Sequence, residues 1–310
     1  MHAADAPSGA FAVRHGLARG LTRGTLRGPR FSSPVYGVRE ARTGRARPTP
    51  EEQRLAEFAP HLLAVRRLAA SYAPRMRPDQ FFSHDTALAL LGVPTPDGWE
   101  ACLHVSALRP RNGPTARAAI GHRLQQREPA WSFVRGLRIE HPVRAWVQAS
   151  TVWMHDDLVA AADHLILPKH GLATLDELRA EASRMRRHAL DDVLSDVREG
   201  SESFRETQLR LACMRAGLPE PELNVGIFAP SGELIARIDQ LYRRQRVAVE
   251  YDGRQHASDQ AQFERDADRW DAIRAAGWDH VRILRKHLVP DPSLAVAKIA
   301  AALARHSPLP

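Results

Sequence analysis

The chain has 310 residues, of which 44% are hydrophobic and 26% are charged. This length suits two or three domains, and the composition excludes a disordered or fibrous protein. The two cysteines, Cys102 and Cys213, lie far apart and outside any CxxC or CxxH pair, which excludes a disulfide framework and a structural zinc finger. No apolar stretch is long enough to span a bilayer, and the first residues lack the apolar core of a signal peptide. The sequence therefore predicts a soluble cytoplasmic protein that does not bind membranes.

The formal net charge of +8 is concentrated near the N-terminus. Residues 1–50 contain nine arginines against Asp5 and Glu40, a balance of +7, so the rest of the chain carries only +1. A concentrated positive segment favours a polyanion such as DNA or RNA, because each neutralised phosphate releases condensed counterions. The alternative is a solvated basic tail. Only three of the 44 basic residues are lysines, an imbalance that genomic base composition can also produce.

Residues 1–50 form the first of three segments that differ in composition. They are predicted to contain a short helix at Leu17–Leu26, in which Thr22 caps a turn, and a strand at Val35–Val38. The sequence TGRARPTPEEQ then reads as a linker, whose two prolines lead into a helix that ends near Tyr72.

Residues 51–199 alternate helices with short strands and are predicted to form a central α+β domain. Ser83 is placed to cap a helix that ends at Gly92, and Thr174 with Glu177 has the spacing of a capping box. The histidines of this segment fall on different predicted elements, so we do not expect them to act as metal ligands or bases. These histidines are His84, His104, His122 and His141.

From residue 200 onward the predicted pattern is helix, three strands, helix, strand and helix. Ser203–Arg215 is an amphipathic helix, and Arg246–Asp252 is an apolar, β-branched strand of the kind that lies in the centre of a sheet. Gln260–Ala276 reads as a long charged helix and Ser293–Arg305 as a closing helix. Strands before and after a helix imply a mixed sheet flanked by helices, so residues 200–310 are predicted to form an α/β domain.

Acidic residues gather at the ends of these strands. Asp239 lies near the end of one strand, and Glu250 and Asp252 share one face of the next, so a hairpin pairing of the two strands places Asp239 beside Glu250. Because burial of an unpaired charge is costly, Glu250 in its apolar strand must be neutral, paired or bound to a cation. Clustered oxygen ligands favour Mg²⁺ or Mn²⁺. The alternative is an ordinary salt bridge from Glu250 to Arg237 or Arg243.

Other residues near these acids have weaker individual signals. Glu206, on the preceding helix, reads as surface charge when taken alone. Asp266 and Arg269 lie three apart on one helical face, the spacing of an intrahelical ion pair. Gly253 ends the strand and allows His256 to turn back toward the acids.

These residues form an ordered set over about residues 200–305: Glu206, Asp239, VAVEYDGRQH, Asp266-x-x-Arg269 and AAGWDHVRI. The set resembles the family of very-short-patch-repair-like endonuclease-domain proteins, which have a restriction-endonuclease-like fold with a PD-(D/E)xK core. The resemblance implies a Mg²⁺ or Mn²⁺ ion held by Asp239, Glu250 and Glu206. It also implies a site completed by Asp252 and His256, with support from Asp266, Arg269 and Arg282.

One position departs from the broader restriction-endonuclease pattern. Asp252 stands two residues after the motif glutamate, where restriction enzymes usually carry lysine. A lysine there stabilises the charge of the transition state and helps to orient water. These duties then pass to a metal ion, to His256, or to a basic group such as Arg254 or Lys286. The same acid is common in this branch of the family.

The first two segments carry a second resemblance. The stretch GLTRGTLRGPRFSSPVYGV is similar to the small winged-helix DNA-binding segment of abortive-infection antitoxins and their regulator relatives. The phrases SHDTALALLGVP, LHVSAL and LRIEHPVRAWVQAS are similar to the central domain that follows it in those proteins. The resemblance implies a wing near Tyr36 and phosphate contacts from four arginines. These are Arg19, Arg23, Arg27 and Arg30.

Two functional hypotheses follow from the sequence. In the first, the chain is a metal-dependent DNA endonuclease whose N-terminal segment positions DNA. Its acids and a Mg²⁺ or Mn²⁺ cofactor activate water for attack on the phosphodiester bond, with His256 as the proton carrier. In the second, the chain is a non-catalytic DNA-binding regulator or toxin–antitoxin component, and its nuclease fold serves binding or dimerisation. The expected partners are DNA, a second copy of the chain or a partner protein.

Overall fold

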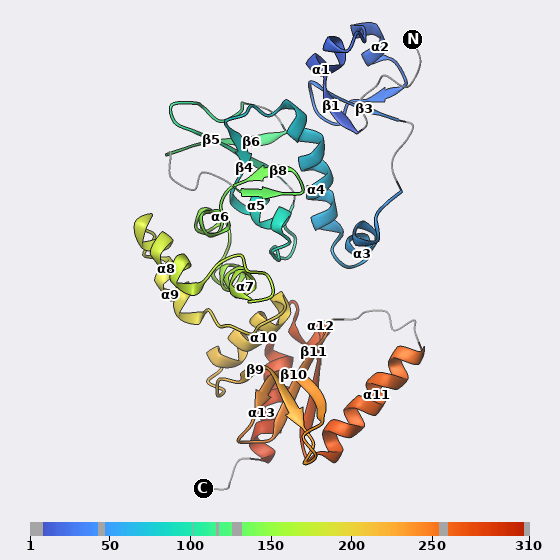
Figure 1. Ribbon diagram of the computed structural model, residues 1–310. Coiled ribbons are helices and arrows are strands. Elements are labelled where there is room, and N and C mark those ends of the chain that lie inside the picture. Colours follow the sequence, from blue (N-terminus) through green and yellow to red (C-terminus); the bar gives the residue numbers. More distant parts are fainter. Residues whose placement is uncertain are drawn as a thin grey trace. The chain divides into compact units, whose positions relative to one another are not determined.

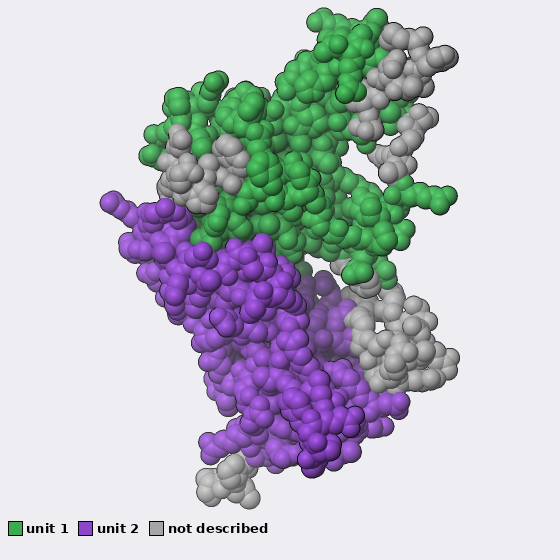
Figure 2. Space-filling view, viewed as in Figure 1, with its two compact units in different colours: residues 1–153 green, residues 154–310 purple. Residues whose placement is uncertain are grey.

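The computed structural model describes residues 9–42, 47–100, 102–115, 118–125, 132–253 and 260–306, and only the backbone of Phe58 and residues 260–266. It confirms the α/β class, with mixed sheets flanked by helices (Figure 1). The chain divides into two compact units, residues 1–153 and 154–310 (Figure 2). None of the described helices combines the length and the apolar composition needed to cross a membrane.

Unit 1 begins with a small α/β subdomain. Its strands form an antiparallel sheet in the order β1-β3-β2, and its core consists of Phe11, Leu21, Leu26 and Phe31. The elements are β1 (Ala10–Ala12), α1 (Val13–Ala18), α2 (Arg23–Arg27), β2 (Phe31–Ser32) and β3 (Val38–Ala41).

Two sequence predictions in this subdomain are wrong in detail. The predicted helix at Leu17–Leu26 is two short helices, because Gly20 adopts a φ of 82° between them. The predicted strand at Val35–Val38 begins only at Val38, because Gly37, with a φ of 82°, lies in the preceding turn. The predicted role of Thr22 is confirmed, since its hydroxyl accepts the Thr25 N–H at the start of α2 at 3.1 Å.

The rest of unit 1 is a five-stranded mixed sheet with helices. The strand order is β6-β5-β4-β8-β7, and β4 pairs antiparallel with β5 while β5 pairs parallel with β6. Ser83 occupies the N-cap position of α5 as predicted, but its side chain makes no capping hydrogen bond. The helix ends at Gly92 with a φ of 88°, as predicted. The helices are α3 (Pro50–Phe58), α4 (Pro60–Tyr72), α5 (His84–Leu91) and α6 (Pro142–Ala149), with a 3₁₀ turn at Ala73–Arg75. The strands are β4 (Gln80–Phe82), β5 (Leu103–Leu108), β6 (Ala119–Leu124), β7 (Ser132–Val134) and β8 (Leu137–Ile139).

Unit 2 begins with three helices, α7 to α9. A four-stranded mixed sheet of order β12-β11-β10-β9 follows, with further helices on its two faces. The predicted order of elements from residue 200 onward is confirmed, with one additional short helix, α12. The helices are α7 (His155–Ile166), α8 (Leu175–Arg184), α9 (Leu190–Asp196), α10 (Phe204–Arg215), α11 (Gln260–Ala275), α12 (Arg285–Leu288) and α13 (Ser293–Arg305). The strands are β9 (Glu222–Phe228), β10 (Leu234–Tyr242), β11 (Val247–Asp252) and β12 (Asp279–Leu284).

The two faces of this sheet have separate hydrophobic cores. Val247 and Val249 of β11 pack with residues of α10 and α13, including Leu209 and Ile299. Ala248, which points to the other face, packs with Ile273 of α11. Helices therefore cover both faces, and α11 and α13 lie on opposite sides of the sheet in Figure 1.

A buried ion pair connects α7 to α10 within unit 2. The Arg210 guanidinium and the Asp163 carboxylate are 2.9 Å apart, and their side chains are 0% and 1% exposed. Asp163 also accepts hydrogen bonds from the Thr207 hydroxyl and the Arg198 backbone N–H, both at 2.8 Å. The predicted boundary between residues 199 and 200 therefore lies inside unit 2, because these contacts hold α7 against the helix that precedes the C-terminal sheet.

We predict that Asp163→Ala strongly destabilises unit 2, since it leaves the Arg210 charge buried without its carboxylate. The loss should be about 3–5 kcal/mol, measured by urea unfolding monitored by circular dichroism. The matched control is Asp176→Ala, whose side chain is 94% exposed and pairs with Arg179 on the surface of α8. That change should cost at most about 1 kcal/mol. Equal losses in the two variants would contradict a structural role for the buried pair.

Candidate functional site

A row of polar residues crosses the C-terminal sheet from strand to strand. The antiparallel registers Gln240↔Val249 and Ile238↔Val225 place Asp239 of β10 between Asn224 of β9 and Glu250 of β11. The parallel register of β11 with β12 pairs Glu250 with Arg282. Glu250 and Arg282 lie on the side of the sheet that α11 covers, because Arg269 of α11 contacts Glu250, whereas Asn224 contacts Glu206 of α10. The predicted position of Asp239 beside Glu250 follows from the same register.

Asp239 is the most perturbed carboxyl of the row. Its Oδ2 accepts the Tyr251 backbone N–H at 2.8 Å, which ties the side chain to β11. Partial burial, with further contributions from the negative charges of Glu206 and Glu250, raises the pKa of Asp239 from 3.8 to about 7. Glu206 and Glu250 are therefore close enough to Asp239 to repel its negative charge, and Asp239 takes up a proton near neutral pH.

Glu206 joins this group from the first turn of α10. The Ser203 hydroxyl accepts the Glu206 N–H at 3.2 Å and so caps the helix. Glu206 is 8% exposed, and its carboxylate accepts hydrogen bonds from the Asn224 amide at 2.7 Å and the Glu202 N–H at 2.8 Å. Neutral donors thus orient Glu206 toward Asp239. The surface role that its sequence position suggests is wrong.

Glu250 is paired on both of its oxygens. Oε1 contacts the Arg269 guanidinium of α11, and Oε2 lies 2.8 Å from Nε2 of His280, whose side chain is 4% exposed. Glu250 therefore does pair with an arginine, although the two candidates from the sequence have other partners. Arg237 contacts Glu202, and Arg243 contacts Glu222.

The remaining predicted residues divide into two groups. Asp252 pairs with Arg282, whose guanidinium also lies 4.5 Å from the centre of the Trp270 ring of α11. Arg269 donates to the Arg237 carbonyl at 3.1 Å in addition to pairing with Glu250. His256, Arg254 and the side chain of Asp266 lie outside the described residues. Arg269 and Arg282 thus bring positive charge to Glu250 and Asp252.

The donor set of this site suits a hard divalent cation. Carboxylate oxygens are the ligands of Mg²⁺ and Mn²⁺, and Mg²⁺ usually binds through one or two carboxylates and retains several waters. Asp239 and Glu206 offer oxygens whose mutual repulsion adds to burial in raising the pKa of Asp239, and a cation would relieve this repulsion. Glu250 would join them only after it exchanges Arg269 for the cation. The acids therefore fit Mg²⁺ or Mn²⁺ with Asp239 and Glu206 as the first ligands.

The four arginines expected to bind phosphate are all exposed. Arg23 and Arg27 are the first and last residues of α2, while Arg19 follows α1 and Arg30 precedes β2. Tyr36 is 90% exposed in the connection between β2 and β3. These side chains are accessible to a polyanion.

Sequence reasoning missed two residues of the acidic site and a second cluster elsewhere. Asn224 and His280 have no motif of their own, although alternation along β12 places His280 on the same face as Arg282. In unit 1, three of the histidines thought to be separate come together. Only the pairing register of the strands could have revealed either grouping.

Comparison with known proteins gives distant relatives. No known family profile matches the chain. The uncharacterized proteins MT2308 and Rv2248, from two strains of Mycobacterium tuberculosis, are each 28% identical to it over 233 residues, which is 71% of this chain and 79% of theirs. The crystal structure of the RV2827C protein from Mycobacterium tuberculosis covers 72% of this chain and 84% of its own, with 14% identity and a TM-score of 0.35. The resemblances to endonucleases and to antitoxins remain predictions.

The raised pKa of Asp239 predicts a stability that falls with pH. Between the unfolded value of about 3.9 and the folded value of about 7, the folded chain keeps a proton that the unfolded chain has released. The free energy of unfolding should therefore decrease from pH 4 to pH 7 by at most about 1.4 kcal/mol per pH unit. Urea unfolding at pH 5 and pH 8 measures this decrease.

Asp239→Asn should remove most of this pH dependence, because asparagine does not titrate. Glu222→Gln on the same sheet is the matched control, since Arg243 lowers the pKa of Glu222 and leaves it ionised throughout this range. An identical pH dependence in Asp239→Asn and in the unsubstituted chain would contradict the assignment.

Proposed function

We propose that this chain is a metal-dependent endonuclease that hydrolyses phosphodiester bonds in DNA at the acidic site of unit 2. The observation that supports it most is that Glu206 and Glu250 lie close to Asp239, where their negative charges add to the burial that raises the pKa of Asp239 to about 7. Such an accumulation of negative charge on a sheet face destabilises the fold unless a proton or a cation neutralises it. In the proposed nuclease, a divalent cation that also contacts the phosphate would neutralise these carboxylates.

The residues of the chain divide the work of this reaction. Asp239 and Glu206 would hold Mg²⁺ or Mn²⁺, and Glu250 would complete the ligand set. The ion supplies polarisation of the scissile phosphate and a lowered pKa for the attacking water. Arg269 and Arg282 would provide the positive charge that lysine supplies in the broader restriction-endonuclease pattern, because their guanidinium groups contact Glu250 and Asp252. His256 remains the predicted proton carrier.

Conversion of supercoiled plasmid tests this proposal. The purified chain should nick or linearise the plasmid with Mg²⁺ or Mn²⁺ and leave it intact with EDTA. The products should carry 5′-phosphate and 3′-hydroxyl ends. Asp239→Asn and Glu250→Gln should each reduce the cleavage rate by at least about 100-fold, the scale of loss when one charge-stabilising group is removed from an active site.

Glu222→Gln is the matched control, because this carboxylate lies on β9 of the same sheet and pairs with Arg243 outside the acidic row. It should cleave at the rate of the unsubstituted chain. Cleavage that survives both Asp239→Asn and Glu250→Gln would indicate a contaminating nuclease and would contradict the proposal.

A second function, a non-catalytic DNA-binding regulator, is favoured by one observation. Arg269 and His280 occupy both oxygens of Glu250, and Asp252 stands in place of lysine. A site whose carboxylate is neutralised by protein side chains needs no metal ion for stability, so the fold can serve binding alone. A sequence-preferring footprint that is unchanged by Asp239→Asn and Glu250→Gln, without any cleavage, would support the regulator over the nuclease.

Both functions place DNA on the N-terminal arginines. Arg23→Ala combined with Arg27→Ala should weaken binding to duplex DNA and reduce the slope of log K against log salt by about 0.9 for each phosphate that the chain no longer neutralises. Fluorescence anisotropy at several salt concentrations measures both quantities. The control is Arg179→Ala combined with Arg187→Ala, which removes the same charge from exposed positions of unit 2. Equal weakening of DNA binding in the two double variants would show that the loss depends only on net charge, and would contradict a specific role of Arg23 and Arg27.

A further inference from the structure

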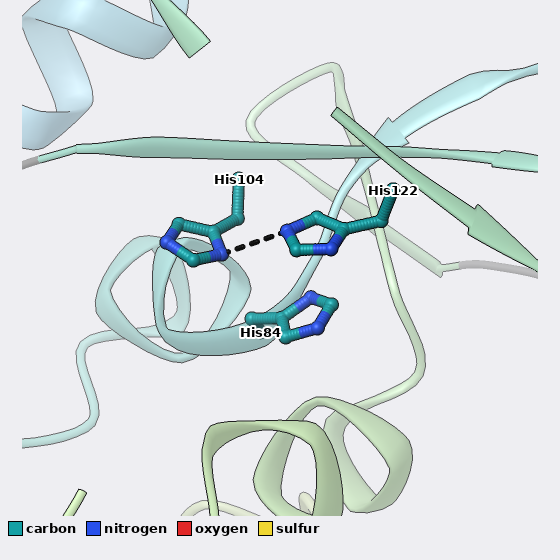
Figure 3. Close-up of side chains that lie close together, drawn as sticks. All are labelled: His84, His104 and His122. Atoms are coloured by element: carbon teal, nitrogen blue, oxygen red, sulfur yellow. Dashed lines mark hydrogen bonds between the residues drawn. The ribbon is translucent and has the colours of Figure 1, made fainter. Parts of the chain in front are cut away.

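Three histidines of unit 1 meet on one side of its five-stranded sheet. His84 is the first residue of α5, His104 lies on β5, and His122 lies on the neighbouring strand β6 (Figure 3). One ring nitrogen from each of the three lies within 4.8 Å of the others. Among the described residues, no other group of three histidine, cysteine or acidic side chains comes this close.

The nitrogen positions are near those of a metal site. Nδ1 of His104 and Nε2 of His122 are 3.0 Å apart. Two imidazole nitrogens bound to one tetrahedral Zn²⁺ at about 2.0–2.1 Å are separated by roughly 3.3 Å. The pair therefore needs only a small adjustment, in which a cation replaces the proton that the two nitrogens share. The ring of His84 stacks on that of His122, with centroids 3.9 Å apart, and its nitrogen lies within 4.8 Å of the other two. Because imidazole lone pairs lie in the ring plane, His84 must turn out of this stack to bind the same ion as His122.

The fold sets the direction of each ring. His104 and Ser106 point to the same side of β5, and the parallel register places His122 opposite Ser106, so His104 and His122 are diagonal neighbours on one face. His84 has a φ of 54°, in the left-handed region that residues other than glycine rarely adopt. The Gln148 side chain holds this conformation, because its Oε1 accepts the His84 N–H at 3.1 Å.

A buried carboxylate lies behind the cluster. Asp85 Oδ1 is 3.7 Å from Nε2 of His104, the nitrogen that faces away from His122. Within the described part of the chain this oxygen has no hydrogen-bond partner, whereas Oδ2 accepts the Trp99 indole N–H at 2.8 Å. Metal-bound histidines commonly donate their second ring N–H to such a carboxylate, which fixes the tautomer and strengthens the ligand.

A packing role alone explains these features poorly. Histidines do stack without any ligand elsewhere in this chain, since His164 and His170 lie with ring centroids 4.1 Å apart. That pair is not part of a group of three in the described residues. The unit 1 cluster differs because it combines three neighbouring nitrogens, a buried carboxylate oxygen that accepts no hydrogen bond among the described residues, and a left-handed backbone at one histidine. Strain of this kind persists where the surrounding structure enforces it, and it gathers at ligand sites.

We propose that His84, His104 and His122 bind one Zn²⁺ ion, with Asp85 orienting His104 from behind. Neutral imidazole is a preferred ligand of zinc and its neighbours in the first transition series, and a poor ligand of Mg²⁺. Burial, together with the neighbouring imidazoles, lowers the pKa of His84 to about 3 and of His122 to about 4, so both rings are neutral at pH 7. Zinc takes four ligands, so three histidines leave one position for water or a small ligand. His122 lies on the edge strand β6 and is only partly buried, which gives that position access from solvent.

Metal titration of the full chain, free of any polyhistidine tag and stripped with a chelator, tests the proposal. Zn²⁺ should bind with a stoichiometry of one per chain in competition with a chromophoric chelator. Co²⁺ should give the intense visible absorption of a tetrahedral complex. His122→Gln should weaken Zn²⁺ binding by more than about 100-fold, beyond the range of roughly 10–100-fold that loss of an outer-sphere partner costs. Asp85→Asn should weaken Zn²⁺ binding by roughly 10–100-fold and leave the Co²⁺ spectrum unchanged.

Three controls isolate the cluster. His170→Gln removes a histidine from the stacked pair of unit 2, Cys102→Ser removes a thiol near Asp85, and Asp239→Asn removes a carboxylate of the acidic site. All three should bind Zn²⁺ as the unsubstituted chain does. Since His122 is partly exposed on an edge strand, His122→Gln should fold, and circular dichroism checks this. Absence of saturable Zn²⁺ binding, or equal binding by folded His122→Gln, would overturn the proposal whether or not the chain cleaves DNA.

Discussion

The pairing of β10 with β11 is the constraint on which the acidic site depends. Val247 and Val249 must face the core that α10 and α13 form, so the alternate residues Ala248 and Glu250 must face α11. A slip of one residue would reverse both sets and place apolar side chains on the wrong face. The register that satisfies this core runs from Tyr242↔Val247 to Gln240↔Val249, and the next residues along the two strands are Asp239 and Glu250. The hydrophobic pattern of one strand therefore determines where the carboxylates of two strands meet.

This dependence explains why much of the site was predictable from the sequence. The alternation of apolar residues around Glu250 indicates a buried strand, and a hairpin is the simplest way to connect it to the strand that contains Asp239. The partners of Glu250 could not be predicted in the same way. Arg269 has the spacing of an intrahelical ion pair with Asp266, yet it reaches across to the sheet because α11 packs over β10 and β11. His280 reaches Glu250 through a parallel pairing whose register no local pattern specifies.

The histidine cluster was missed for a related reason. Its members come from a helix start and from two parallel strands, and each looks isolated when the elements are considered one at a time. Their meeting depends on a parallel register and on a left-handed residue at the start of α5, neither of which has a signature in the sequence. The same limit applies to the boundary expected at residue 199. Composition changes there, but the buried pair of Asp163 with Arg210 joins the segments on either side.

The two clusters differ in the physical reason for taking up a cation. In the acidic site, Arg269 and His280 pair with Glu250 and Arg282 pairs with Asp252, while neutral donors hold Glu206. The repulsion between Glu206 and Asp239 therefore remains, and a proton on Asp239 relieves it, as the proposed cation would in its place. The histidine cluster has no such excess, because His84 and His122 are neutral at pH 7. It would attract a metal by lone-pair donation, which favours soft or borderline ions over Mg²⁺. If both proposals hold, charge relief in one unit and ligand donation in the other would direct hard and borderline cations to different places in a single chain.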